Sequence, residues 1–115
     1  MYQFSYADIQ TDSVADARDR ERQLLARSVD MLTAAAAAGR DSMEAVEALH
    51  FTNRVWTALI EDLGSSDNAL PKELRANLIS VGLWLLREAE DIRQGRTDSF
   101  DSLIEVSQII RDGLQ

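Results

Sequence analysis

The stretch NALPKELRANLISVGLWLLREAEDIRQG, residues 68–95, predicts a long helix and decides the fold class. Pro71 suits the first helical position because its missing N–H would have no partner there. Glu73 adds negative charge in the first turn, where the helix dipole favours it, and Gly95 ends the helix. Apolar residues cover almost every side of its middle, so we expect this helix at the centre of a bundle. They are Leu74, Leu78, Ile79, Val81, Leu83, Trp84, Leu85, Leu86 and Ile92.

A first helix is expected to precede this stretch, beginning near Asp12 or Ser13. Ser13 and Asp16 resemble a capping box, in which two side chains take up backbone N–H groups. Gly39 can close this helix because it adopts positive φ without strain. Between these ends, residues 18–22 alternate in charge, which is typical of a solvated helix face.

A second helix is expected from about Asp41 to Leu63, with Asp41 and Glu44 as another capping box. Its expected apolar stripe is Met43, Val46, Leu49, Trp56, Ile60 and Leu63, widened by Phe51, Val55 and Leu59. A fourth helix is expected from about Ser99 to Arg111. It should bury Phe100, Leu103, Ile104 and Ile110, together with Val106 or Ile109.

The remaining sequence contains no strand pattern, because no segment alternates strictly and β-branched residues are scattered. Helices joined by loops of two to eight residues pack antiparallel. We therefore expect an all-α fold, a small antiparallel bundle of about four helices with an aromatic N-terminal leader. The length of 115 residues predicts one domain, residues 1–115.

The charge balance limits the classes of partner. Twenty acidic and twelve basic residues give a formal net charge of −8, which repels phosphate backbones and anionic lipid headgroups. We therefore expect neither direct nucleic-acid binding nor membrane binding. Cysteine is absent, which excludes disulfides and thiol chemistry, and no targeting signal is visible, so we expect a cytoplasmic protein.

The inventory for catalysis is thin. His50 is the only histidine, and no spacing suits a zinc or di-iron site. Neither a phosphate-binding glycine loop nor a nucleophile elbow is present. Adjacent acidic residues such as Glu61 and Asp62 point about 100° apart on a helix, which favours a solvated face over acid–base work. We expect no enzymatic activity, no cofactor and no metal.

Large aromatic residues are crowded at the N-terminus. Tyr2, Phe4 and Tyr6 share one side if this leader is extended. One interpretation is a lid over the bundle. The other is a detachable strip that occupies or completes a groove for a partner, since aromatic side chains dominate interface hot spots as well as cores.

Residues near the two tryptophans leave similar alternatives open. Trp56 and Trp84 suit either core packing or a hot spot. Gly82 inside a helix costs about 0.5–1 kcal/mol relative to alanine, which indicates close approach of another helix, from the bundle or from a partner. Arg75 is expected either at the surface or bonded to the turn at residues 65–70.

Several segments resemble the FlaF family of alphaproteobacterial flagellar biosynthesis proteins. They are the opening MYQFSY (1–6), Arg20-Glu21-Arg22, LIEDL (59–63) and above all DNALPKELRANLISVGLW (67–84). The resemblance spans nearly the whole chain. It implies a cytoplasmic helper of flagellin, in company with a translational regulator called FlbT.

Two functions follow from this resemblance. The first is a secretion chaperone that captures an amphipathic terminal helix of flagellin in a groove, which a small acidic bundle without catalytic groups suits. The second is a regulator of flagellin synthesis that acts through FlbT. The candidate contact residues are Tyr2, Phe4, Tyr6, Trp56, Leu70, Arg75 and Trp84.

Overall fold

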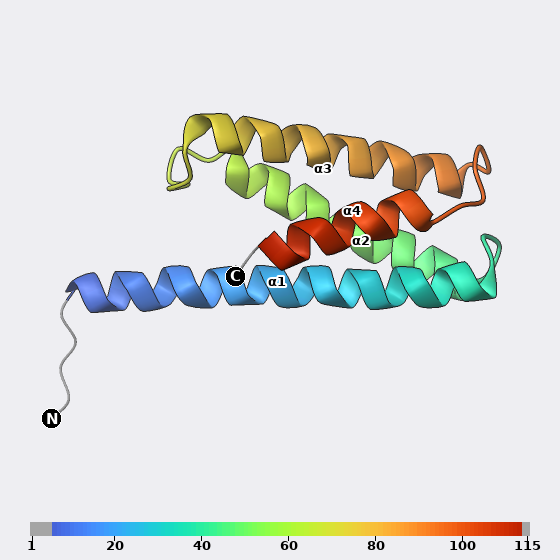
Figure 1. The fold of residues 1–115 in the computed structure, drawn as a ribbon, viewed down its shortest axis with the longest axis horizontal. Coiled ribbons are helices and arrows are strands. Elements are labelled where there is room, and N and C mark those ends of the chain that lie inside the picture. The colour runs from blue at the N-terminus through green and yellow to red at the C-terminus, as the bar shows by residue number, and fades with distance from the viewer. Residues whose placement is uncertain (1–5, 114–115) are drawn as a thin grey trace, which may run out of the picture.

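The computed structural model describes residues 6–113, with side chains from Ala15 onward, as four helices (Figure 1). They are α1 (Tyr6–Ala38), α2 (Met43–Leu63), α3 (Lys72–Arg93) and α4 (Asp101–Gly113). The predicted all-α bundle of four helices is confirmed. Within the described part of the chain, no helix is both long and apolar enough to cross a membrane.

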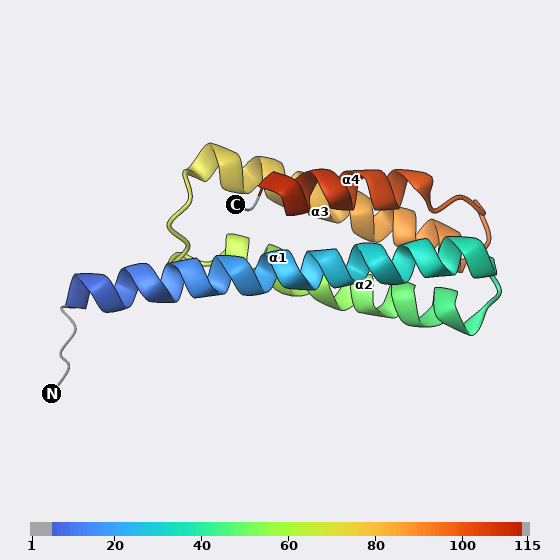
Figure 2. The same cartoon turned by 60° about the horizontal axis from the view of Figure 1, so that its bottom comes forward.

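The four helices form two layers, α1 with α2 and α3 with α4 (Figure 2). α1 packs against α2 and α4, and α3 packs against α2 and α4, whereas α1 and α3 make no close approach over the described residues. The prediction that α3 lies at the centre is therefore wrong. Its apolar surplus faces outward instead, with Leu74, Leu83 and Trp84 43%, 52% and 37% exposed.

The first helix is longer than the sequence pattern suggested. α1 begins at Tyr6, so Ser13 lies inside the helix and does not cap it. Neither glycine nor proline occurs before Gly39, so nothing stops the helix from extending toward the N-terminus. The N-terminal part of α1 projects past the other helices (Figures 1 and 2). The radius of gyration, 16.2 Å, accordingly exceeds the ~13 Å of a compact chain of this length.

The turns at one end of the bundle are tied together. Gly39 has φ of 103°, as predicted. Ser42, and not the predicted Asp41, caps α2 by accepting a hydrogen bond from the backbone N–H of Ala45 at 3.1 Å. Arg40 in this turn donates to Asp98 in the α3–α4 loop at 2.8 Å. This ion pair joins two loops that lie 58 residues apart.

The other two helix starts differ slightly from their predicted positions. Pro71 directly precedes α3 instead of occupying its first turn. Ser99 also lies before its helix, where its hydroxyl accepts from the backbone N–H of Asp101 at 3.2 Å. Phe100 is buried, as predicted, whereas Ile109 is 61% exposed.

The core uses smaller residues than the predicted stripe of α2. Met43 and Val46 are 65% and 59% exposed, so their predicted burial is wrong. Ala45, Ala48 and Thr52 face the interior in their place. These small side chains let α1 and α2 approach closely. The Thr52 hydroxyl makes a buried 2.8 Å hydrogen bond with the hydroxyl of Ser28 on α1.

Candidate partner-binding groove

A narrow apolar groove lies where α2 ends and the chain turns into α3. We call it the Trp56 groove. Its volume is about 70 Å³, and all four helices and the α2–α3 loop contribute to it. The lining residues are Glu21 and Leu25 of α1, Trp56, Leu59, Asp62 and Leu63 of α2, Asn68 and Leu70 of the loop, Leu78 of α3 and Ile110 of α4.

The indole of Trp56 forms part of this groove but is only 1% exposed. Of the two interpretations of Trp56, core packing is therefore the one the structure shows. A Cβ placed on Gly82 of α3 would lie 3.0 Å from its Cε3 atom, so α3 approaches α2 closely, as predicted for Gly82. The indole N–H has no hydrogen-bond partner among the described residues. Burying such a donor costs free energy unless something supplies an acceptor.

The α2–α3 loop is held at the edge of the groove by the amide of Asn68. Its Nδ2 donates to a carboxylate oxygen of Asp62 at 3.1 Å. Its Oδ1 accepts from the backbone N–H of Leu70 at 3.0 Å. These two bonds fix Leu70, which is half-buried, beside the groove.

Arg75 supports this loop from α3. Its Nη1 donates to the backbone carbonyls of Ser65 at 3.2 Å and Leu63 at 3.4 Å. These carbonyls lie at the C-terminal end of α2, where helical partners run out. Of the two placements predicted for Arg75, bonding to the turn is confirmed. Arg75 is thus a residue that positions the groove rather than one that lines it.

Two carboxylates, Glu21 and Asp62, form an acidic rim. Burial, and then the negative charge of Asp62, raise the pKa of Glu21, and the charges of Arg18 and Arg20 oppose this rise without cancelling it. Within residues 15–113, neither carboxylate is in an ion pair. The rim therefore places two carboxylates without ion pairs in this range beside an apolar floor.

A second hollow continues the groove along the seam between α1 and α2. It has a volume of about 350 Å³ and shares Glu21 and Leu59 with the Trp56 groove. Its wall includes Leu24, which is 45% exposed. Phe51 and Arg54 of α2 also line this hollow, and the guanidinium of Arg27 lies 5.4 Å from the ring centroid of Phe51. The seam thus offers an elongated, mostly apolar track beside α1.

The remaining predicted contact residues lie elsewhere or outside the described part. Trp84 lines a separate shallow depression with Ser80, Val81 and Val106, on the α3–α4 face. Tyr2 and Phe4 lie outside the described residues. Tyr6 is the first residue of α1, but its side chain is not among those described. The structure therefore brings together Trp56 and Leu70, with Arg75 behind them.

The sequence did not identify the three polar residues that line this groove, namely Glu21, Asp62 and Asn68. Both acidic residues occur in charged runs that are typical of solvated helix faces, and Asn68 occurs in an ordinary polar turn. Nothing in the local pattern distinguishes a rim carboxylate from a surface carboxylate. Only the crossing of α1 and α2 brings Glu21 and Asp62 to one edge.

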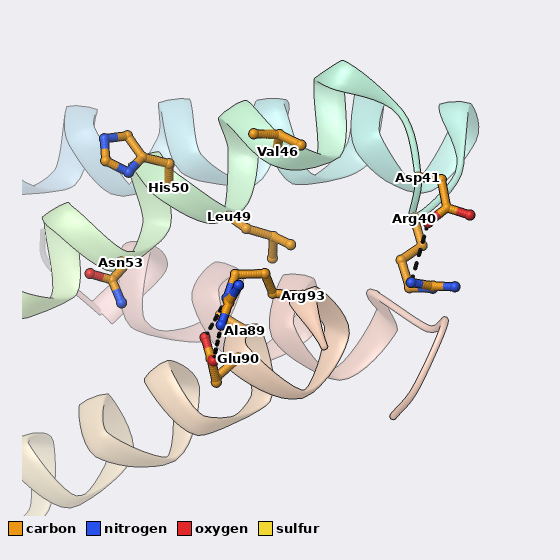
Figure 3. A pocket seen from close by; sticks show the side chains of 9 residues that line it. All are labelled: Arg40, Asp41, Val46, Leu49, His50, Asn53, Ala89, Glu90 and Arg93. Carbon is orange, nitrogen blue, oxygen red and sulfur yellow. Dashed lines mark hydrogen bonds and ion pairs between the residues drawn. The ribbon is translucent and has the colours of Figure 1, made fainter. Parts of the chain in front are cut away.

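A larger cleft of about 480 Å³ separates α2 from α3 near the Arg40 turn (Figure 3). Leu49 and Ala89 supply apolar walls, and His50 and Asn53 lie at one end. Its charged groups already satisfy one another. Glu90 accepts from Arg93 one turn away, and Arg40 pairs with Asp41 and Asp98. With its cations and anions internally paired, this cleft offers a ligand less than the Trp56 groove does.

A family model described as "Flagellar protein FlaF" matches residues 2–114, nearly the whole chain. No curated protein matches the chain, and no solved structure matches it.

Proposed function

Because the chain belongs to the FlaF family of flagellar proteins, we propose that it is a cytoplasmic secretion chaperone for flagellin. Its task is to capture an amphipathic terminal helix of flagellin, and it needs no catalytic group for this. The observation that carries the proposal is the Trp56 groove with its continuation along α1, an apolar track that the bundle leaves open. Helix-in-groove binding uses such a track.

The energetics of capture are those of apolar burial. Each Å² of apolar surface removed from water contributes roughly 25 cal/mol, from which the cost of ordering the client is subtracted. A cavity of about 10–15 Å³ holds one water, so the ~70 Å³ of the Trp56 groove admits one apolar side chain of the client as an anchor. Flagellin held in this way cannot use the same helix to polymerise prematurely.

The projecting part of α1 extends the proposed surface. A client helix that runs alongside α1 rises 1.5 Å per residue, as α1 itself does. A segment of about fifteen residues that starts beside Glu21 therefore reaches the first turn of α1 at Tyr6. The partner-binding role predicted for Tyr2 and Phe4, which precede α1 in the sequence, belongs to this proposal as well.

Calorimetry with peptides of the two terminal helices of flagellin tests this proposal. We expect one peptide to bind the wild-type protein, and we expect Leu70→Ala, at the edge of the groove, to weaken binding at least about fivefold, since hot-spot truncations cost more than 1 kcal/mol. Met43→Ala removes an equally apolar side chain far from the groove and serves as the control. Failure of both peptides to bind, or equal loss in both variants, contradicts helix capture in this groove.

The second candidate function is regulation of flagellin synthesis through FlbT. The exposed apolar face of α3, with Leu83 and Trp84, favours a second protein partner because it lies apart from the Trp56 groove. Recovery of FlbT without flagellin in a pull-down from cell extract would favour this function. A Trp84→Ala variant that loses FlbT but keeps flagellin would assign the two partners to two faces.

A further inference from the structure

We infer that the Trp56 groove selects an amphipathic helix that carries a lysine or arginine beside its apolar stripe, with Glu21 and Asp62 as the carboxylates that receive the cation. This inference rests on the proposed capture of a helix and adds a requirement for its sequence. The partner is thus defined by an apolar anchor and a flanking positive charge.

The size of the groove favours a side chain of a protein over a free small molecule. Sites for small molecules usually have volumes of about 300–1,000 Å³ and bury most of the ligand. The Trp56 groove has only about 70 Å³, and the 350 Å³ hollow that continues it lies open along the seam between α1 and α2. Leu25, Leu59 and Leu63 line it and give an anchor apolar contacts. A nucleic acid or an anionic lipid is disfavoured because the rim itself is negative.

The acidic rim gives the groove its preference for a cation. Glu21 and Asp62 come from different helices and line the same groove, and they are near enough for the charge of one to raise the pKa of the other. Asp19, Glu90 and Asp91 have arginine partners, whereas other described carboxylates, such as Asp30 and Glu47, have none. Glu21 and Asp62 differ from these exposed carboxylates because they line one apolar groove together. The two rim carboxylates have none within the described residues, and a basic residue of the client would supply one.

Within the described residues, the arginines of α1 near the rim form no ion pair with Glu21 or Asp62. Arg22 pairs with Asp19 on the outer face of the helix. Arg18 and Arg20 lower the pKa of Glu21 only through space, without an ion pair. The polar contact that Asp62 does make is with the amide of Asn68, which leaves its charge uncompensated.

The buried indole of Trp56 gives independent support for a bound partner, because its N–H lacks a hydrogen-bond acceptor among the described residues. Trp56 is 1% exposed, and its buried indole N–H has no acceptor in the described part of the protein. In native proteins nearly all such donors are paired. A client helix that inserts here brings polar side chains as well as the anchor, and these can supply the acceptor.

Calorimetry with altered peptides and altered protein tests the inference. The probe is the flagellin terminal-helix peptide that binds the wild-type protein, together with copies in which each lysine or arginine is replaced by glutamine. We expect one copy to bind about 5- to 10-fold more weakly, as truncation of a partly exposed charge pair does. The same loss is expected for the native peptide with the Glu21→Gln/Asp62→Asn protein.

The matched control is Asp30→Asn/Glu47→Gln, which removes the same net charge at exposed positions outside the groove. We expect this control to change affinity by less than about twofold. Exchanging the charges, with Glu21→Lys in the protein and glutamate in the peptide, is expected to restore binding. Unchanged affinity with all the glutamine copies would overturn the inference and leave helix capture intact. Absence of binding by any flagellin peptide would overturn both.

Discussion

Gly82 of α3 lies directly against Trp56 of α2. A Cβ on Gly82 would come within 3.0 Å of the indole Cε3 and within 2.9 Å of Cγ1 of Ile60. Real Cβ atoms do not approach neighbours so closely, so this position needs glycine for space rather than for a special backbone conformation. The position of the Trp56 ring, and with it the floor of the groove, depends on the absence of a side chain at Gly82.

Gly82→Ala should therefore destabilise the bundle although alanine is the better helix former. Overpacking a core costs roughly 1–3 kcal/mol, and the gain in helix propensity returns about 0.5–1 kcal/mol. We expect a net loss of about 1 kcal/mol in urea unfolding. Gly113→Ala, where no atom lies within 4 Å of the added Cβ, is the control and should be neutral. Equal stability of the two variants would refute the packing argument.

Arg75 should matter for the shape of the groove. Arg75→Gln removes the hydrogen bonds from its guanidinium to the carbonyls of Leu63 and Ser65, so we expect a loss of about 1–2 kcal/mol. Because the loop that carries Leu70 loosens, the affinity for the flagellin peptide should fall as well. The exposed Lys72→Gln, three residues earlier, is the control. A variant as stable as wild type that binds equally well would contradict the supporting role of Arg75.

The buried pair of Ser28 and Thr52 should behave as a unit. Thr52→Val leaves the Ser28 hydroxyl without the partner it has at 2.8 Å, and a buried unsatisfied polar group costs about 1–3 kcal/mol. Ser28→Ala removes the other hydroxyl of the pair and leaves that of Thr52 without its partner. We expect the double variant to lose less stability than the two single variants lose together. Simple additivity in thermal unfolding would show that the two hydroxyls do not depend on each other.

Titration should separate the rim carboxylate from a surface one. NMR should show the pKa of Glu21 above 4.5, because of burial and then Asp62, and Asp62→Asn should bring it down. The pKa of Glu90, lowered to about 2 by its hydrogen bond from Arg93, is the reference in the same spectra. A Glu21 pKa at or below the ordinary value would contradict the acidic rim.

The raised pKa of Glu21 also determines whether the stability of the protein rises or falls with pH. Since folding raises the pKa of Glu21, the folded state holds its proton more tightly, and stability falls as pH rises through that pKa. Glu21→Gln removes this cost. We expect the variant to match wild type at pH 3, where Glu21 is protonated in both states. At pH 7 it should be more stable by no more than about 0.5 kcal/mol, as for other half-exposed substitutions. If the variant matched wild type at pH 3 but were less stable than wild type at pH 7, the result would contradict a raised pKa of Glu21.

Much of the fold could be predicted from local signals. Gly39, Gly64 and Gly95 mark helix ends, and the apolar pattern of residues 68–95 identifies α3. The place of α3 in the bundle could not be predicted, because an apolar helix that leaves Leu83 and Trp84 exposed looks the same in sequence as a central one.

The site was predictable only in part. Trp56 stands out because the chain has only two tryptophans, and Gly82 correctly indicated a close helix contact. Leu70, one leucine among many, does not stand out by residue type. Glu21 and Asp62 could not be identified, since they lie 41 residues apart and meet only because α1 and α2 cross at this edge. The long α1 also shows the limit of cap motifs, because a favourable Ser13 does not start a helix that nothing upstream interrupts.

The indole N–H signals in a two-dimensional ¹⁵N NMR spectrum test the central claim most directly. The chain has two tryptophans, and they line different surfaces. When the flagellin terminal-helix peptide is added, we predict that the signal of Trp56 moves, because its N–H has no acceptor among the described residues and gains one. The signal of Trp84 should stay nearly in place. Movement of the Trp84 signal with Trp56 unchanged would show that flagellin binds elsewhere and would contradict the account.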